Sequence, residues 1–302
     1  MNAPLRLARG IAMSNLWEPV SGVYWSTAPF LPSLGWLESL GNSSFFTTVF
    51  GALAGAFAGA WAAQRIAARN KLQDELLKEI RSINSAILLG QAIFNIGLAI
   101  KVDGALPLKT AYDEEVKIFK ENADDFQGKF KGELNLEKIR CATMPISALH
   151  PLVLTEISSS AGAVRALLHL KIAIDGQLEA HASRNDIIDG FIKKEFPRGL
   201  KFEDLYFGQE RDGVTHRAYA DSIRDIYKTA DDILFYSQKM CEYLHLHAVG
   251  LRLKYKKVSK EKIIIGKLII DSRVDPSLIP GEESYAEWIA GYQPYQNATE
   301  AP

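Results

Sequence analysis

The order of apolar and charged positions divides residues 45–100 into three helical stretches. Residues 45–63 read FFTTVFGALAGAFAGAWAA and contain neither a charge nor a proline. These nineteen residues would rise about 28 Å as a helix, close to the ~30 Å hydrocarbon core of a bilayer. The pattern therefore predicts a transmembrane helix at 45–63, which continues into a charged helix over residues 64–81.

The charges on either side of this apolar run predict its orientation. A secretory signal peptide needs positive charge before its apolar region, and here only Asn42, Ser43 and Ser44 precede the run. The positive-inside rule places the flank with more bases in the cytoplasm. We therefore expect a single-pass protein of the bacterial inner membrane, with its N-terminus outside and its C-terminal part cytoplasmic. Five bases follow the run: Arg65, Arg69, Lys71, Lys78 and Arg81.

Residues 83–100 are uncharged as well, which leaves a second reading open in which they return through the membrane. Against this, Asn84, Gln91 and Asn95 lie along one side of the helix, where they would be costly in lipid. Apolar residues upstream and within this stretch also recur at spacings of four and three, as they do in helices that pack along a seam. We favour one span, and we expect four seam residues to contribute to self-association: Leu76, Ile80, Ile83 and Ile87.

A stripe of glycines runs along the predicted span. Gly51, Gly55 and Gly59 recur every four residues, and small residues on one stripe let the backbones of two membrane helices approach closely. Glycine and alanine are common in membrane helices in any case, but three glycines in register favour self-association. We therefore predict a homo-oligomer in contact with membrane lipid.

The remainder of the chain reads as mainly α. We expect a turn at Lys101–Pro107 and helices over 108–127, 161–192 and 215 to about 256, because apolar residues recur there at helical spacing. The run KIIIGKLIID at 262–271 is the one convincing β pattern. The predicted organisation has four parts: an extracytoplasmic or interfacial segment (1–44), a transmembrane helix (45–63), a cytoplasmic helical domain (64–256), and a small β hairpin with an acidic tail (257–302).

Charge is balanced over the whole chain but segregated near its end. The 302 residues carry a net charge of −1, so no global field directs the chain to nucleic acid or anionic lipid. Residues 252–267 have a net charge of +6 and residues 271–302 of −5. This pattern is typical of a basic strand or hairpin opposed by an acidic tail. The alternative is a phosphate- or headgroup-binding stripe, whose members would be Arg252, Lys254, Lys256, Lys257 and Lys260.

No pattern of catalytic or metal-binding residues emerges. Cys141 and Cys241 are too few for a disulfide framework and have no metal-ligand spacing. His245 and His247 are two residues apart on a predicted helix, so their side chains point in nearly opposite directions and cannot share a metal. Glycine-rich phosphate loops and hydrolase motifs are also absent from the sequence. We expect neither a cofactor nor a metal, and a non-enzymatic protein.

Two segments resemble a group of uncharacterised bacterial proteins with one membrane span and a cytoplasmic helical domain. They are GAWAAQRIAARNKLQDELLKEIRSINSAI at 59–87 and, more weakly, DLYFGQERDGVTHRAYADSIRDIYKTADDILFYS at 204–237. In outline this build is similar to that of membrane effectors of anti-phage defence systems. The resemblance implies a self-associating effector that disrupts the membrane. The alternative is a membrane-tethered scaffold or sensor that binds a cytoplasmic protein, or nucleic acid.

Overall fold

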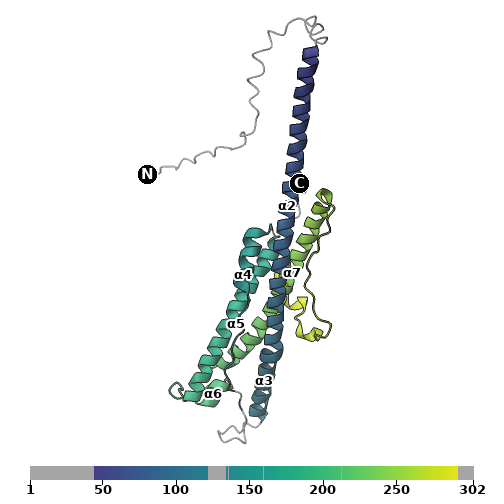
Figure 1. Cartoon of the computed structure of the whole chain (residues 1–302). Coiled ribbons are helices and arrows are strands. Elements are labelled where there is room, and N and C mark those ends of the chain that lie inside the picture. The colour runs from purple at the N-terminus through teal and green to yellow at the C-terminus, as the bar shows by residue number, and fades with distance from the viewer. Residues whose placement is uncertain (1–43, 122–133, 135, 159, 212, 292–302) are drawn as a thin grey trace, which may run out of the picture. The chain divides into compact units, whose positions relative to one another are not determined.

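A computed structural model describes residues 44–121, 134, 136–158, 160–211 and 213–291. The chain divides into two units, residues 1–68 and residues 69–302. The predicted N-terminal segment lies outside the described residues up to position 43, as do the end of the helix expected at 108–127 and the chain after residue 291. The described part is mainly helical, which confirms the predicted fold class at that level (Figure 1).

In the first unit, the described residues belong to helix α2, which runs as one helix through Ser44–Ile100. Each residue from 48 to 68 is exposed. Alanine and phenylalanine make up much of this stretch, and no proline interrupts the hydrogen-bond ladder of the helix.

The second unit is a bundle built around the later part of α2, around α5 (Ala161–Lys193) and around α7 (Ala218–Val258). Figure 1 shows α5 and α7 lying side by side, and these two helices make the most extensive contact between elements of the fold. Apolar residues at steps of three and four give each helix a buried face. The helices predicted at 161–192 and 215–256 are thus confirmed, with ends that differ by no more than three residues.

Shorter helices close the two ends of this bundle. One end holds α4 (Ile146–Pro151) and the π-helical turn η3 (Leu152–Glu156). The other holds α3 (Leu106–Glu121) and α6 (Phe202–Tyr206). After α7, the chain forms two short 3₁₀ turns and a final helix: η4 (Pro276–Leu278), η5 (Glu282–Tyr285) and α8 (Ala286–Ala290).

Two clusters of buried side chains fill the bundle. The first joins α2, η3, α5 and α7, and fully buried Ile80, Ile83 and Leu167 lie within it. The second is rich in aromatic residues and joins α3, α5, α6 and α7. There the rings of Tyr206 and Tyr219 stack with centroids 4.6 Å apart, and burial raises the pKa of both tyrosines. Burial of this much apolar surface is the main force that holds the helices together.

The turn predicted at Lys101–Pro107 is wrong. The helix widens into a π-helical turn, η2 (Lys101–Ala105), and continues directly into α3. Lys101 is buried there, where its ammonium lies 2.5 Å from the carboxylate of Asp231. Pro107 follows the π-helical turn within this continuous helix, and because it has no N–H it donates no hydrogen bond to the turn before it. The ion pair with Asp231 on α7 holds the π-helical turn in place, and the helix goes on past Asp103-Gly104 and Pro107.

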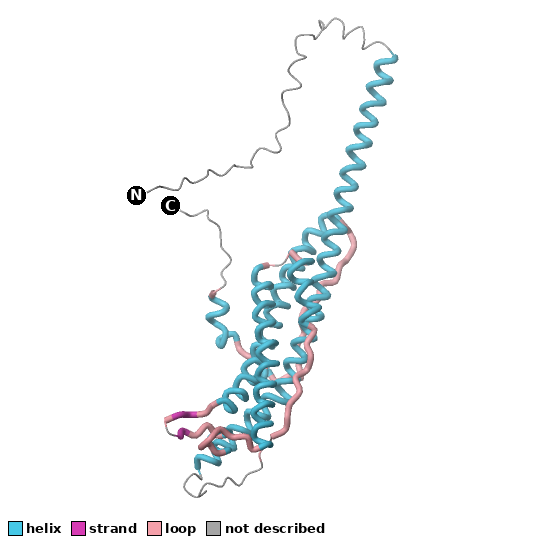
Figure 2. The backbone as a smooth tube through the Cα atoms, turned by 90° about the vertical axis from the view of Figure 1, so that its left-hand side faces the viewer, coloured by secondary structure: helices cyan, strands magenta, loops and turns pink. Residues whose placement is uncertain are grey.

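Over residues 257–291, the described part of the range 257–302, the predicted β hairpin is not found. Figure 2 shows the strands of the described residues in magenta, and these are β1 (Glu210–Arg211) and β2 (Val214–Thr215), two residues each. Residues 259–270 are instead an extended segment without a strand partner. Ile263 and Ile265 pack against the core and so, after a shift of one residue at Gly266, does Leu268, whereas Ile264 and Ile269 stay 85% and 70% exposed. The segment therefore has the alternation of a strand, but it packs on helices rather than in a sheet.

Candidate functional site

The three glycines of the predicted association stripe lie on an open surface. A methyl group built at Gly51, Gly55 or Gly59 would meet no atom of the described residues within 4 Å. Large apolar side chains on the same stretch are exposed too, with Phe57 81% and Trp61 59% accessible. Among the described residues, one helix is long and apolar enough to cross a membrane, and it runs from Thr48 to Glu121 when α2, η2 and α3 are counted together.

The four seam residues occupy a different environment. Leu76, Ile80, Ile83 and Ile87 are 7%, 0%, 0% and 1% exposed, and all four belong to the core of the second unit. The seam that their spacing predicts is thus formed within one chain. These side chains are not free to contact a second copy in this structure. The contribution to self-association that we expected from them therefore has no support here.

Two further glycines show how closely α2 and α7 approach each other. A methyl group at Gly90 would lie 2.5 Å from Cys241 Sγ, and one at Gly97 would lie 2.8 Å from Ile233 Cγ2. Real Cβ atoms essentially never come that close to a neighbour, so a larger residue at either position would force the facing side chain to move. Residues 83–100 thus pack into the bundle, which favours the single-span reading over a return through the membrane.

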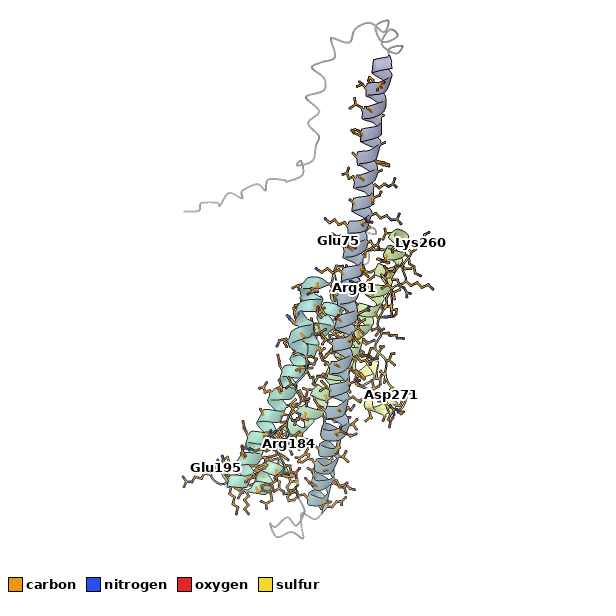
Figure 3. The ribbon with its side chains drawn as sticks, viewed as in Figure 1. Glu75, Arg81, Arg184, Glu195, Lys260 and Asp271 are labelled. Carbon is orange, nitrogen blue, oxygen red and sulfur yellow. The ribbon has the colours of Figure 1, made fainter. Side chains whose placement is uncertain are left out.

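The basic residues at 252–260 lie at the end of α7 and just beyond it. Lys254, Lys256, Lys257 and Lys260 are exposed, whereas Arg252 is half-buried and its Nε atom is buried without a hydrogen-bond partner. Arg69 and Gln73 fix this end of α7 to α2, because Arg69 Nε donates to Val258 O (2.9 Å) and Gln73 Nε2 to Tyr255 Oη (3.3 Å). Figure 3 shows Lys260 beside the part of α2 that carries Glu75.

The acidic tail does not neutralise these bases within the part of the chain that the structure describes. Glu282 pairs with Lys239, and Asp271 pairs with Arg273 at 2.6 Å. Asp232 accepts a hydrogen bond from Tyr285 Oη at 2.8 Å. No ion pair between residues 252–267 and residues 271–291 is present there. The interpretation of a basic strand opposed by an acidic tail is therefore wrong for the described residues.

Polar side chains on α2 and α7 hold the extended segment in place. The amide of Asn84 donates to Ile264 O (3.0 Å) and accepts from Gly266 N (2.8 Å), so it pairs with the backbone as a neighbouring strand would. Gln91 Nε2 donates to Ile269 O at 3.3 Å. His245 Nδ1 lies 2.7 Å from Gly266 O, and since a carbonyl can only accept, this nitrogen carries the proton. The sequence places Asn84 and Gln91 on one side of the helix, but it does not identify their partner.

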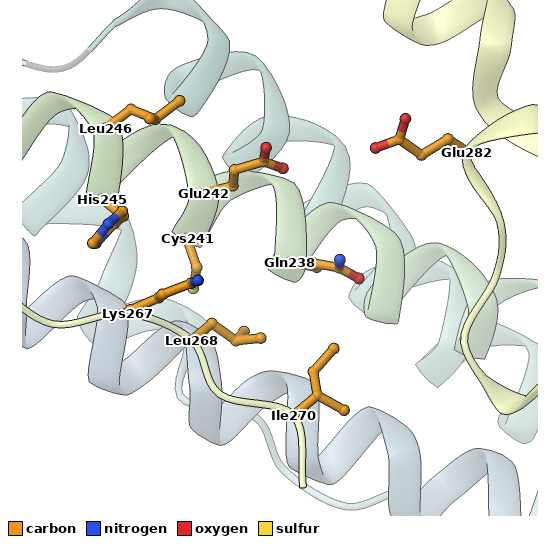
Figure 4. A pocket seen from close by; sticks show the side chains of 9 residues that line it. All are labelled: Gln238, Cys241, Glu242, His245, Leu246, Lys267, Leu268, Ile270 and Glu282. Carbon is orange, nitrogen blue, oxygen red and sulfur yellow. The ribbon is translucent and has the colours of Figure 1, made fainter. Parts of the chain in front are cut away.

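A pocket of about 530 Å³ opens between α7 and the chain that follows it (Figure 4). Gln238, Glu242 and His245 line it from α7, and Lys267 and Leu268 line it from the extended segment. Cys241 also faces the pocket, but burial raises the pKa of its thiol to about 12, so it is a poor nucleophile at neutral pH. The mixture of apolar and charged groups suits a small amphipathic molecule.

A second polar cluster has the composition of a catalytic triad but not its connectivity. Glu79 Oε1 accepts from Ser158 Oγ (2.5 Å) and lies 3.0 Å from His247 Nε2. The same His247 Nε2 faces Ser158 Oγ at 3.5 Å. A triad uses both ring nitrogens, one for the serine and one for the carboxylate, whereas here one nitrogen faces both partners. The cluster therefore ties α2, α7 and the loop before α5 together and does not activate the serine.

Neither similarity to known proteins nor a metal site assigns a chemistry to the pocket or to the polar clusters. No protein-family model, no curated protein and no solved structure matches this chain. Within the described ranges, no group of three or more histidine, cysteine or acidic side chains could hold a metal ion. His245 and His247 reach different partners, Gly266 and Glu79, as their spacing on a helix predicts.

Proposed function

We propose that this chain is a membrane-anchored, self-associating protein of the bacterial inner membrane that acts without catalysing a reaction. Residues 45–63 would span the membrane, with the N-terminus outside and the bundle cytoplasmic. The observation that carries the proposal is the exposure of every residue from 48 to 68 on a helix that is apolar around its whole circumference up to residue 63. A helix with no polar face is stable as a buried or membrane-spanning element.

Water is a poor solvent for this surface. Phe50, Leu53 and Trp61 are each about 60% exposed, at 62%, 61% and 59%. Each such side chain would gain about 1.5–3 kcal/mol from full transfer out of water. Lipid removes that cost, and Arg65 and Arg69 follow where the apolar run ends, as the positive-inside rule requires for a cytoplasmic flank.

The glycine stripe supplies the surface for self-association. Because the seam residues are satisfied inside the bundle, contact between copies would run through Gly51, Gly55 and Gly59. Close approach of two backbones there gives van der Waals contact along the helix, which is the main source of association between membrane helices. In the effector form of this proposal, such association perturbs the bilayer and lowers the membrane potential.

The self-association test replaces Gly55 and Gly59 with leucine. Leucine holds facing backbones apart and should remove the van der Waals contact on which association depends, so that light scattering in detergent finds a smaller species. Ala60→Leu is the matched control, because it adds bulk on a side of the helix about 140° away from Gly55. An unchanged mass for the double variant would contradict association through the stripe.

The effector form is tested in cells by a voltage-sensitive dye. Overexpression of the full chain should depolarise the inner membrane, whereas a chain without residues 1–64 and the Gly55→Leu/Gly59→Leu variant should not. Equal potentials in all three cultures would contradict the effector form.

A membrane-tethered binding protein is the second candidate, and the pocket beside α7 favours it. Its lining of Leu246, Leu268 and Ile270 with Glu242 and Lys267 could hold an amphipathic ligand or part of a cytoplasmic partner. Recovery of one defined partner by the full chain, and its loss on Leu268→Arg, would favour this function. The membrane potential would then stay constant on overexpression.

A further inference from the structure

Unit 2 has a strongly basic surface at one end, and we call it the basic end. It comprises Arg69 and Lys71 on α2 and Lys254, Lys256, Lys257 and Lys260 at the end of α7. All six side chains are exposed. Hydrogen bonds from Arg69 to Val258 O and from Gln73 to Tyr255 Oη hold the end of α7 against α2, so these charges share one surface.

The charge of this surface is not balanced locally. Residues 69–75 and 252–262 together contain eight bases and three acids, a net charge of +5. Lys71 lies 3.9 Å from Glu75, but the part of the chain that the structure describes gives no ion pair to Lys254, Lys256, Lys257 or Lys260. Residues 109–121 and 184–206, toward the other end of the bundle, contain eight bases and nine acids, a net charge of −1. Figure 3 places Glu195 there, away from Lys260.

Helix stability accounts for only part of this pattern. Lys256 and Lys257 lie in the last turn of α7, where positive charge offsets the partial negative charge of the helix end. Lys254 precedes that turn and Lys260 follows the helix, so both fall outside this explanation. Exposed bases that share a surface repel one another weakly in water, and a negative partner would turn that repulsion into attraction.

The chain itself limits how far this surface can lie from the proposed span. Ala63 and Arg69 are six residues apart in α2, which is about 9 Å of helix rise. Even a fully extended chain of that length would reach no more than about 21 Å. Near the cytoplasmic leaflet each base contributes about 1 kcal/mol of attraction to anionic lipid, within a Debye length of about 8 Å.

We propose that the basic end binds the anionic phospholipid headgroups of the leaflet from which residues 45–63 emerge. The proposal rests on the membrane-anchored function above, and it adds that the bundle contacts the membrane through a second, electrostatic site. Continuity with the span favours lipid over nucleic acid as the source of phosphate, because the tether keeps this surface near headgroups. Lysine, a flexible point charge, suits a fluid layer of phosphates.

The test uses the full chain in lipid nanodiscs and a lysine-acetylating reagent read by mass spectrometry. Co-elution with nanodiscs is measured first. In discs with about 30% phosphatidylglycerol at about 50 mM salt, Lys254, Lys256, Lys257 and Lys260 should react about threefold more slowly than in neutral discs, and about 500 mM salt should abolish the difference. Lys193 and Lys194, which are exposed at the end of α5, should react equally in all conditions.

The outcomes separate this proposal from the function on which it rests. A chain that does not co-elute with nanodiscs overturns the anchor and this inference together. A chain that does co-elute, but whose four lysines react equally in neutral and anionic discs, overturns this inference alone. Protection by added duplex DNA in neutral discs, without protection by phosphatidylglycerol, would also overturn it in favour of nucleic acid.

A matched pair of variants keeps the result independent of folding. Replacing the four lysines with glutamine should leave the melting temperature nearly unchanged, because all four side chains are exposed. In phosphatidylglycerol discs, the acetylation rate of Lys71 in this quadruple variant should rise toward the rate measured in neutral discs. Lys193→Gln/Lys194→Gln removes two charges at the other end and should leave the reactivity at Lys71 unchanged. An unchanged Lys71 in the quadruple variant contradicts the shared surface.

Discussion

Residues 48–72 and residues 76–100 belong to one helix, α2, yet their side chains meet different surroundings. Every position of the first stretch is exposed, whereas the second stretch buries a face that includes Ile80, Ile83 and Phe94. The first stretch is apolar around the whole helix up to residue 63, and the second concentrates its apolar residues at steps of three and four. The distribution of apolar residues, rather than their number, therefore separates a stretch exposed on all sides from a stretch that packs against the bundle.

Glycine makes the same comparison at single positions. Gly51, Gly55 and Gly59 have open space where a side chain would go, whereas Gly90 and Gly97 have Cys241 and Ile233 in that space. In the second stretch, side chains of the same chain occupy the space that a larger residue would need. In the first stretch, glycine leaves a smooth surface, and close packing of a partner helix in a membrane, as we propose, needs such a surface.

The largest expected difference between the two stretches comes from losing a buried side chain. Ile87→Ala should lower the free energy of unfolding by about 2–5 kcal/mol, because Ile87 is 1% exposed and the truncation leaves a cavity in the core. Leu88→Ala, at the next position along the helix, is the matched control. The Leu88 side chain is 69% exposed, so its truncation should cost less than about 1 kcal/mol. Thermal unfolding of the full chain in detergent measures both. Equal losses would contradict the assigned faces.

A smaller difference is expected when a methyl group is added to a glycine. Gly90→Ala forces Cys241 Sγ and Met240 Cε to move from 2.5 and 2.7 Å, and overpacking of this kind costs about 1–3 kcal/mol. Gly55→Ala meets nothing within 4 Å and should leave unfolding unchanged or slightly improve helix stability. The melting temperatures of the two variants give the answer. A stable Gly90→Ala protein would mean that α2 and α7 are further apart than described.

The smallest effect concerns a contact of the second stretch, and it depends on pH. Burial alone would raise the pKa of Glu79, but hydrogen bonds from Ser158 and the nearby His247 outweigh it, so the folded pKa lies below the usual 4.5. Stability from ionised Glu79 is therefore present above about pH 4.5 and is lost as pH falls through the lower folded pKa. Glu79→Gln should cost about 1 kcal/mol at pH 7 and progressively less below pH 4.5. A loss that grows toward acid pH would have the wrong sign.

Local pattern was sufficient to predict the long helices. The steps of three and four in 161–192 and 215–256 reflect a buried face, and a buried face is a property that neighbouring residues share. The turn prediction at 101–107 was wrong because Gly104 and Pro107 usually end helices. Here the helix continues through a π-helical turn, which the ion pair of Lys101 with Asp231 stabilises. That compensation involves a residue 130 positions away, which no local window contains.

The partners of a surface were harder to predict than the surface itself. The spacing of Leu76 to Ile87 indicates a helix seam, but it does not say whether the second helix comes from the same chain. The alternation in KIIIGKLIID indicates an extended segment, but its partners are the side chains of Asn84, Gln91 and His245 instead of a strand. The cluster of Glu79, Ser158 and His247 likewise joins residues far apart in sequence. The glycine stripe and the lipid contact remain predictions.

The central claim is that residues 45–63 of α2 lie in lipid, while residues 76–100 of the same helix lie in a bundle bathed by water. A nitroxide placed in turn at Leu53→Cys and Leu88→Cys tests it, since these side chains are 61% and 69% exposed on one helix. Cys141→Ser removes the half-exposed native thiol, and Cys241 is too buried to react. In liposomes, power saturation should show oxygen relaxing the label at 53 and a water-soluble nickel chelate relaxing the label at 88. Strong relaxation of both labels by the chelate, or of both by oxygen alone, would contradict the account.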